Sequence, residues 1–349
     1  MAQSIGTRQH VLQGTFTALM FAWVLTSGLG CRLYDLALWR PARFSGTEEC
    51  PVEKVKGVTY HDGPDAHAKH HQLDLFLPQG RKDYPVVVLV HGGVWMWGDK
   101  HCYGLYAAVG ENLARQGIGV VMPNYRLSPA VKHPAHVQDV ARAVAWTRRY
   151  IATYGGNPDQ LFVAGHSAGG HLAALLATDP TYLAAEGLKV TDLKGVITSS
   201  GVYRIPLHAM DVTLGGASPS AFWLDQVVPP RSAKSWSWAR LAPLPGIPVC
   251  VDLFRPAFAA DPQLRVQASP LYHVRPGLPP FLILVAGNDL PTLDNMAQEF
   301  HDALARQKVP VHLLRIPHRN HCSVLFRAID RDDPVAQALV QFVQDCCDP

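Results

Sequence analysis

Residues 165–169, GHSAG, place a single serine among glycines, between an apolar run and a segment with helical spacing. A serine hydroxyl becomes an effective nucleophile when a neighbouring base removes its proton. Small flanking residues permit the sharp strand-to-helix turn that exposes such a hydroxyl, close to a helix N-terminus that favours developing negative charge. Ser167 is therefore the candidate nucleophile, and the simpler alternative is a serine that caps the helix.

A second stretch suited to chemistry is HGGVWMW at residues 91–97, which follows an apolar run. Acyl transfer to a serine forms a tetrahedral oxyanion, and backbone N–H groups aimed at that oxygen lower the barrier. The predicted oxyanion donors are the N–H groups of Gly93, Val94 and Ala168. Two tryptophans are expected near the acyl-binding pocket, with a purely core role as the alternative: Trp95 and Trp97.

Strands and helices alternate along the chain from about residue 57. The segment 71–78, HQLDLFLP, alternates polar and apolar residues and ends at a proline, which favours an edge strand. Continuous apolar runs such as 86–90 are typical of strands covered on both faces, as in a parallel sheet. Apolar residues at helical spacing predict helices at 136–155, 295–308 and near the C-terminus. The sequence therefore predicts an α/β fold with a doubly wound, mostly parallel sheet.

One region interrupts this alternation, at about residues 211–268. It is rich in proline, has no clear period and contains Trp223, Trp236 and Trp238. Functional loops are commonly grafted at the carboxyl edge of a sheet. We expect an inserted cap over the site, and the alternative is a poorly ordered surface insertion.

The composition limits the classes of function. The chain has 349 residues, 48% of them hydrophobic and only 17% charged, with a net charge of +3. We therefore expect residues 56–349 to form one large domain carrying the cap, preceded by a linker at 31–55. No long basic run is present, which argues against nucleic acid as a partner. The histidine-rich segment 67–71 lacks metal-ligand spacing, so we expect a solvated surface there.

The N-terminus differs from the rest of the chain. Residues 11–30 are uncharged and mostly apolar, and Arg8 precedes them. Their number reaches the roughly 20 residues that cross a bilayer, but the pattern also resembles a signal peptide. Cys31 follows a near match to a bacterial lipoprotein cleavage box, in which Gly28 departs from the usual aliphatic residue. We expect export or membrane attachment, with a cleaved signal, a retained anchor and lipid attachment at Cys31 left open. A buried N-terminal helix of a cytosolic protein is the alternative.

Several motifs together resemble one superfamily. They are HGGVW, NYRLSP with the downstream Asp139, GHSAGG, and a late GND followed by a histidine. Over about residues 56–342 the chain resembles the α/β-hydrolases, in the esterase/lipase branch that includes feruloyl- or acetyl-esterase-like and hormone-sensitive-lipase-like enzymes. The HGGxW form is more similar to the feruloyl- or acetyl-esterase-like group. Arg204 departs from the aspartate that such enzymes often carry after GVY.

The resemblance implies a triad in the order Ser, Asp, His. It places the acid in the loop after the strand FLILVAG, at Asp289, with Asp294 as the rival nearer the following helix. It places the histidine a few residues after the strand VPVHLLRIP, at His321, with His318 as the other candidate. Asp289 would hold the imidazole of His321 in the tautomer that accepts the serine proton.

These observations predict a serine hydrolase that cleaves small-molecule carboxylic esters, with short acyl chains expected because tryptophans crowd the 91–97 loop. We expect no metal and no organic cofactor, and the oligomeric state stays open. A formamidase or amidase of the same fold is one alternative. A non-catalytic binding module on a hydrolase scaffold is another, and a Ser167→Ala variant separates it from an enzyme because binding should survive and hydrolysis should not.

Overall fold

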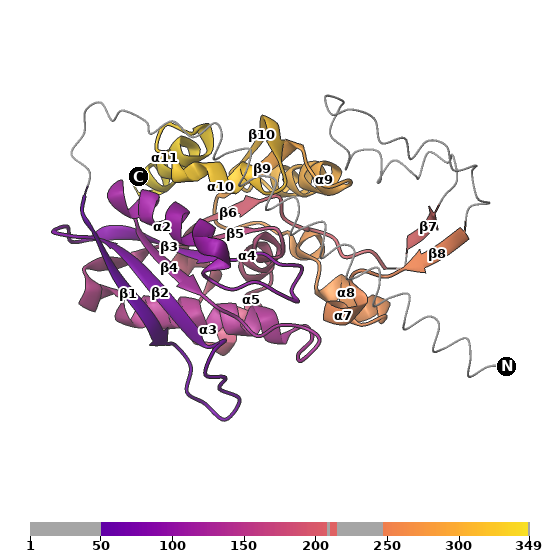
Figure 1. The fold of residues 1–349 in the computed structure, drawn as a ribbon, viewed down its shortest axis with the longest axis horizontal. Helices are drawn as coiled ribbons and strands as arrows, with labels where there is room; N and C mark the ends of the chain where they lie inside the picture. The colour runs from indigo at the N-terminus through magenta and orange to yellow at the C-terminus, as the bar shows by residue number, and fades with distance from the viewer. Residues whose placement is uncertain (1–49, 208–209, 215–246, 348–349) are drawn as a thin grey trace, which may run out of the picture. The chain divides into compact units, whose positions relative to one another are not determined.

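The computed structural model describes residues 50–207, 210–214 and 247–347 (Figure 1). The described residues divide into two compact units, one that holds 206–207, 210–214 and 247–255, and the other 50–205 and 256–347. In the first unit, β7 (Met210–Leu214) and β8 (Ile247–Val251) pair antiparallel. Residues 215–246 of the expected cap lie outside the described residues. The domain boundaries and the cap therefore stay predictions.

The second unit is built on an eight-stranded sheet with the order β1-β2-β4-β3-β5-β6-β9-β10. β1 and β2 pair antiparallel, as do β2 and β4, while the remaining neighbours are parallel. The predicted mostly parallel, doubly wound α/β sheet is confirmed. The strands are β1 Val52–Thr59, β2 Gln72–Pro78, β3 Tyr84–Val90, β4 Gly119–Pro123, β5 Gly156–His166, β6 Leu193–Ser199, β9 Phe281–Asn288 and β10 Val311–Asn320.

Helices cover both faces of this sheet (Figure 1). On one face, the apolar sides of α2 (Leu105–Arg115), α10 (Ser323–Phe326) and α11 (Pro334–Cys347) form a single cluster with strand residues such as Leu282. On the other face lie α3 (Ala135–Tyr150), α4 (Ala168–Thr178) and α9 (Leu293–Arg306). Phe300 of α9 packs edge-on against Phe281 of β9. Phe281 precedes Leu282, and successive strand residues point to opposite faces of a sheet, so α9 lies on the face opposite the cluster that contains Leu282. The short helices are α5 Pro180–Ala185, α7 Arg255–Phe258 and α8 Pro262–Gln267.

The edge strand expected at 71–78 is wrong, because β2 has β1 on one side and β4 on the other. β1, a strand the sequence patterns did not predict, takes the edge. The polar residue in the alternation, Asp74, is only 2% exposed. Its carboxylate accepts a hydrogen bond from the N–H of Gly57 and lies 3.1 Å from Nζ of Lys100. The polar and apolar alternation at 71–78 indicated a strand with one exposed side, but Asp74 is buried because the fold supplies partners for its carboxylate.

A second correction concerns the histidine-rich segment. His71, expected on a solvated surface, is 1% exposed, and its Nε2 lies 3.1 Å from Oδ1 of Asp139. Arg126 holds the same carboxylate with two hydrogen bonds, from Nε and Nη2 at 2.9 and 2.8 Å. Burial opposes ionisation of Asp139, but the contacts with His71 and Arg126 outweigh it and hold the pKa of the carboxyl below its usual value. The NYRLSP motif and its downstream aspartate thus form one buried ion-pair network.

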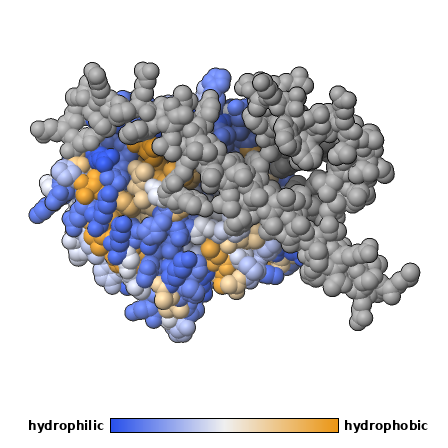
Figure 2. Space-filling model, in the orientation of Figure 1, coloured by the Kyte–Doolittle hydropathy of each residue, from blue (hydrophilic) through white to orange (hydrophobic). Residues whose placement is uncertain are grey.

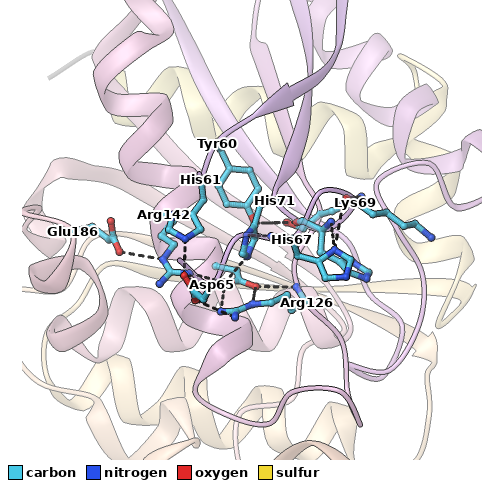
Figure 3. A network of polar contacts seen from close by, with 12 residues as sticks. Tyr60, His61, Asp65, His67, Lys69, His71, Arg126, Arg142 and Glu186 are labelled. Carbon is cyan, nitrogen blue, oxygen red and sulfur yellow. Dashed lines mark hydrogen bonds and ion pairs between the residues drawn. The ribbon is translucent and has the colours of Figure 1, made fainter. Parts of the chain in front are cut away.

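The network reaches outward and inward from Arg126 (Figure 3). Outward, Arg126 and Arg142 both contact Oδ2 of Asp65, at 3.0 and 2.9 Å. Inward, the neighbouring Tyr125 donates its hydroxyl to the backbone oxygen of His91 at 3.1 Å. The side chain of Tyr125, next to Arg126 in the sequence, thus joins the segment after β4 to the loop at 91–97, which the sequence predicts to act on the oxyanion.

The visible surface of the described chain is mainly hydrophilic, and apolar residues appear there in small, separate groups (Figure 2). Scattered apolar side chains of this kind are ordinary for a protein surface. Within the described ranges, no helix has both the length and the apolar character to cross a membrane. The apolar segment at 11–30 lies outside those ranges, so the membrane expectation stays a prediction.

Candidate active site

Ser167 lies at the tight turn between β5, which ends at His166, and α4, which begins at Ala168. Its backbone has φ 56° and ψ −120°, a conformation that is costly for a residue with a side chain. The turn needs glycine on both sides. A Cβ on Gly165 would lie 2.2 Å from the oxygen of Gly169, and one on Gly169 would lie 2.2 Å from the oxygen of Val90. The turn sets the serine at the carboxyl edge of the sheet.

The structure brings the three predicted triad side chains together. Nε2 of His321 lies 2.9 Å from Oγ of Ser167, and Nδ1 of His321 lies 2.7 Å from Oδ1 of Asp289. Asp289 follows β9 and His321 follows β10, so parallel strands deliver both residues to the edge that carries the serine turn. A carboxylate only accepts hydrogen bonds, so Nδ1 of His321 is the donor and Nε2 is left to accept the serine proton.

The rival acid and base lie elsewhere. Asp294 is in the first turn of α9, and its Oδ1 accepts a hydrogen bond from Nε of Arg315 at 2.8 Å on an exposed surface. His318 is exposed within β10. Of the two candidate acids and the two candidate histidines, Asp289 and His321 are the ones connected to Ser167 by hydrogen bonds.

Asp289 is held as a carboxylate by its hydrogen bonds. Burial opposes ionisation, but hydrogen bonds from His321, Ser200 and the N–H of Ala286 outweigh it and keep the pKa of the carboxyl below its usual value. Ser200 was not singled out by the sequence patterns. It directly follows β6, which lies between β5 and β9, and that position at the shared carboxyl edge was the available signal.

The loop at 91–97 lies against the serine. A Cβ added to Gly92 would come within 3.1 Å of Cβ of Ser167, and one on Gly93 would meet the backbone oxygen of Trp97 at 2.0 Å. The N–H of Trp97 donates to the oxygen of Gly93 at 3.0 Å, which closes the loop on itself. Val94 also has a positive φ, 53°. The contact of Gly92 brings the loop next to Ser167, and the role of the Gly93 and Val94 N–H groups as oxyanion donors stays a prediction.

Trp95 belongs to this loop, and its side chain is buried, with only 2% exposed. Its Nε1 donates to Nδ1 of His171 on α4 at 3.2 Å, and its ring meets Phe258 edge-on at 4.8 Å. Trp97 is half-buried. The side chain of Trp95 thus joins the loop to the helix that follows the serine, while contact of Trp95 and Trp97 with an acyl group stays a prediction.

The arrangement contains a nucleophile, a base, a carboxylate that orients the base, and a helix N-terminus. The N–H of Ala168, the first residue of α4, has no acceptor within the helix because it belongs to the first turn. Among the residues that the structure describes, no group of three or more His, Cys, Asp or Glu side chains is placed to hold a metal ion. These groups suit transfer of an acyl group to serine.

Comparisons with known proteins point the same way. The BD-FAE family model matches residues 73–224. The protein named Probable carboxylic ester hydrolase LipM, from Mycobacterium tuberculosis, is 28% identical over 92% of this chain and 71% of its own length. Esterase LipC from the same organism is 30% identical over 75% of this chain, which spans only 58% of LipC. Kynurenine formamidase of Salmo salar is 24% identical over 84% of this chain and 85% of its own length.

A solved structure supports the fold. Esterase B from Lactobacillus rhamnosis superposes with a TM-score of 0.64 at 20% identity, covering 95% of each chain. At that identity the likeness concerns the fold alone. Together with the sequence relatives and the motifs, it identifies the chain as a member of the α/β-hydrolase superfamily, in its carboxylesterase branch.

Proposed function

We propose that this protein hydrolyses small-molecule carboxylic esters through an acyl-enzyme formed on Ser167. The observation that carries the proposal is the pair of contacts made by His321, at 2.9 Å to Ser167 and 2.7 Å to Asp289. One imidazole can bridge nucleophile and carboxylate in this way when it serves as the base. The similarity to carboxylic ester hydrolases and esterases supports the same reading.

In the first half-reaction, Oγ of Ser167 attacks the acyl carbon while Nε2 of His321 takes the hydroxyl proton. The carbonyl oxygen becomes an oxyanion, which the N–H groups of Gly93, Val94 and Ala168 bind. The tetrahedral intermediate collapses, the C–O bond to the alcohol breaks, and the imidazolium returns its proton to the departing oxygen. The acyl group stays on the serine.

In the second half-reaction, Nε2 of His321 takes a proton from water as the water attacks the acyl carbon. A second tetrahedral intermediate forms, and its collapse releases the carboxylic acid and returns the proton to Ser167. Asp289 stabilises the imidazolium in both halves, because it stays ionised beside Nδ1.

The test is hydrolysis of p-nitrophenyl esters of increasing acyl length by the wild type and by Ser167→Ala. We expect activity on acetate and butyrate and a loss of kcat of about 10⁴- to 10⁶-fold in the variant. The matched control is Thr153→Ala, which removes a hydroxyl from an exposed residue. This variant should hydrolyse esters like the wild type. Activity that survives Ser167→Ala would contradict the mechanism. Serine-dependent activity on long chains alone would overturn the short-acyl proposal and indicate a lipase.

A formamide is the second candidate substrate, because the similarity to kynurenine formamidase extends over most of both chains. The same intermediates serve an amide bond, with His321 protonating the leaving nitrogen. Serine-dependent cleavage of N-formyl aromatic amines in the absence of ester hydrolysis would favour this function. A folded protein that cleaves neither class, yet binds ligand equally well as Ser167→Ala, would instead be a binding module.

We also propose that the apolar N-terminal segment exports the protein or attaches it to a membrane. The support is the sequence of residues 11–30 and Cys31 alone. Intact-mass measurement on protein from the native membrane or envelope fraction tests it. A mass that retains residues 1–30 would refute cleavage, and an added diacylglycerol mass at Cys31 would indicate lipid attachment.

A further inference from the structure

A chain of three hydrogen bonds connects the oxyanion loop to the catalytic histidine behind the serine turn. The N–H of Gly92 donates to the hydroxyl oxygen of Tyr106 at 2.7 Å. That hydroxyl lies 3.0 Å from Nδ1 of His166, and Nε2 of His166 lies 2.7 Å from the backbone oxygen of His321. The linked residues lie in the loop after β3, in α2, at the end of β5 and directly after β10, so these hydrogen bonds join four separate parts of the fold.

The donors and acceptors in this chain agree on one arrangement. The carbonyl of His321 can only accept, so Nε2 of His166 carries the proton and Nδ1 is the acceptor. The N–H of Gly92 can only donate, so the hydroxyl oxygen of Tyr106 accepts that bond. The hydroxyl proton is then free to point at Nδ1 of His166. Every atom of the chain is satisfied with one tautomer and one hydroxyl orientation.

Burial keeps the two side chains neutral. Tyr106 and His166 are 3% and 4% exposed. Burial, together with the nearby His321, lowers the pKa of His166 to about 3, and burial raises the pKa of the Tyr106 hydroxyl well above its usual value. A neutral imidazole keeps one nitrogen as an acceptor, so the chain persists over the pH range in which an esterase works.

We propose that Tyr106 and His166 are positioning residues for the reaction, which set the oxyanion loop and the base at a fixed separation on either side of Ser167. One end of the chain is Gly92, next to the proposed oxyanion donors Gly93 and Val94. The other end is the backbone of His321, whose ring makes the contact with the serine. No proton moves along the chain. This inference rests on the proposed ester hydrolysis.

The first test is Tyr106→Phe, which removes the central hydroxyl and keeps the ring that meets Phe326 edge-on at 5.0 Å. We expect kcat for p-nitrophenyl acetate to fall about 10- to 100-fold, since small misplacements of reacting groups cost that much. KM should change by less than about twofold, because the lost interaction acts on the transition state. The control is Tyr84→Phe, which removes a hydroxyl that donates to the oxygen of Tyr154 at the opposite end of β3. It should keep the wild-type kcat.

The second test compares two substitutions of His166. Leucine removes both hydrogen bonds, whereas the amide of glutamine can still donate to the carbonyl of His321. We therefore expect His166→Gln to retain more of the wild-type kcat than His166→Leu when both are assayed well below their melting temperatures. If His166→Leu fails to fold, the Tyr106→Phe result decides. A kcat in Tyr106→Phe equal to that of Tyr84→Phe would overturn the proposal.

A readout that does not need activity separates this inference from the proposed function. In histidine-labelled protein, the nitrogen NMR signals of His166 should show a neutral ring with the proton on Nε2 at pH 7 and still at pH 5. Tyr106→Phe should shift the Nδ1 signal by removing its donor. A proton on Nδ1 of His166, or protonation of His166 above pH 5, would contradict the proposed hydrogen-bond chain even in an active esterase. Esters left intact by a wild type with the expected signals would refute the proposed function and leave the hydrogen-bond chain standing.

Discussion

The hydroxyl of Ser200 donates a hydrogen bond to Oδ2 of Asp289, the carboxylate oxygen that does not face His321. Oδ2 also accepts the N–H of Ala286 at 3.1 Å, while Oδ1 accepts the N–H of Leu290 at 2.8 Å in addition to the imidazole. Both oxygens are thus held by donors from the ends of β6 and β9. The orientation of the proposed catalytic carboxylate depends on Ser200 as well as on its own loop.

Ser200→Ala should lower kcat by about tenfold, because a hydrogen bond to a charged group contributes about 1.5–3 kcal/mol. The matched control is Ser199→Ala, one residue earlier. Its hydroxyl is buried and has no hydrogen-bond partner within the described part of the chain. Removing it should leave kcat unchanged and should not lower the free energy of unfolding. Steady-state kinetics and urea unfolding of both variants check the pair, and equal losses of kcat would contradict the role given to Ser200.

Asp289→Asn should reduce kcat by about 10⁴-fold, because an amide can present its NH₂ group to Nδ1 of His321 and favour the wrong tautomer. Asp294→Asn is the control. It removes only an exposed ion pair with Arg315, and exposed pairs contribute about 0–1 kcal/mol. Its kcat should match that of the wild type. Activity measurements across pH 6 to 9 check both, and a large loss in Asp294→Asn would return the acid to the rival position.

The serine turn should tolerate no side chain at Gly165. In Gly165→Ala, the new Cβ would lie 2.2 Å from a backbone oxygen of α4, so the turn has to move. We expect the free energy of unfolding to fall by at least about 3 kcal/mol, with loss of activity. Gly187→Ala is the comparison, because Gly187 has a positive φ, 76°, and open space around it. It should cost about 1–2 kcal/mol and leave kcat intact. Thermal unfolding of both variants distinguishes steric overlap from backbone strain.

Buried histidines should make the fold sensitive to acid. Burial lowers the pKa of five of them, to about 3 for His166 and His171 and about 4 for His91, His133 and His136. An unfolded histidine has a pKa of about 6.5, so between these values the unfolded state binds more protons than the folded state. The free energy of unfolding therefore rises with pH and is lost as pH falls from about 6.5 toward 4, by up to about 1.4 kcal/mol per pH unit for each histidine that stays neutral.

His136→Gln should reduce that slope by about the share of one histidine, because glutamine does not titrate. The matched control is His312→Gln at an exposed position of β10, a substitution that removes no buried imidazole. Urea unfolding of both variants at pH 7, 6 and 5 gives the comparison. Identical slopes in the two variants would show that burial of His136 does not govern the acid response.

Local patterns in the sequence were sufficient for the type of fold and for the choice of candidate site residues. Residues 165–169 are close together in the sequence, so the small residues Gly165, Ala168 and Gly169 favour the serine turn where a strand is followed by a helix. The runs of apolar residues predicted most core strands, because burial on both faces requires continuous apolar sequence. The resemblance then selected Asp289 and His321, each directly after a strand, and the structure brings both to Ser167.

The tertiary structure alone decided which residues support these three. Ser200 contacts Asp289 across 89 positions of sequence, and His166 contacts His321 across 155. No local pattern marks such pairs, because they depend on which strands become neighbours in the sheet. Burial was equally non-local: Asp74 and His71 looked solvated, yet each is buried against an ionic partner contributed by a distant segment. A polar residue carries no sign in its own sequence of whether the fold will supply a partner, and that partner decides whether it can be buried.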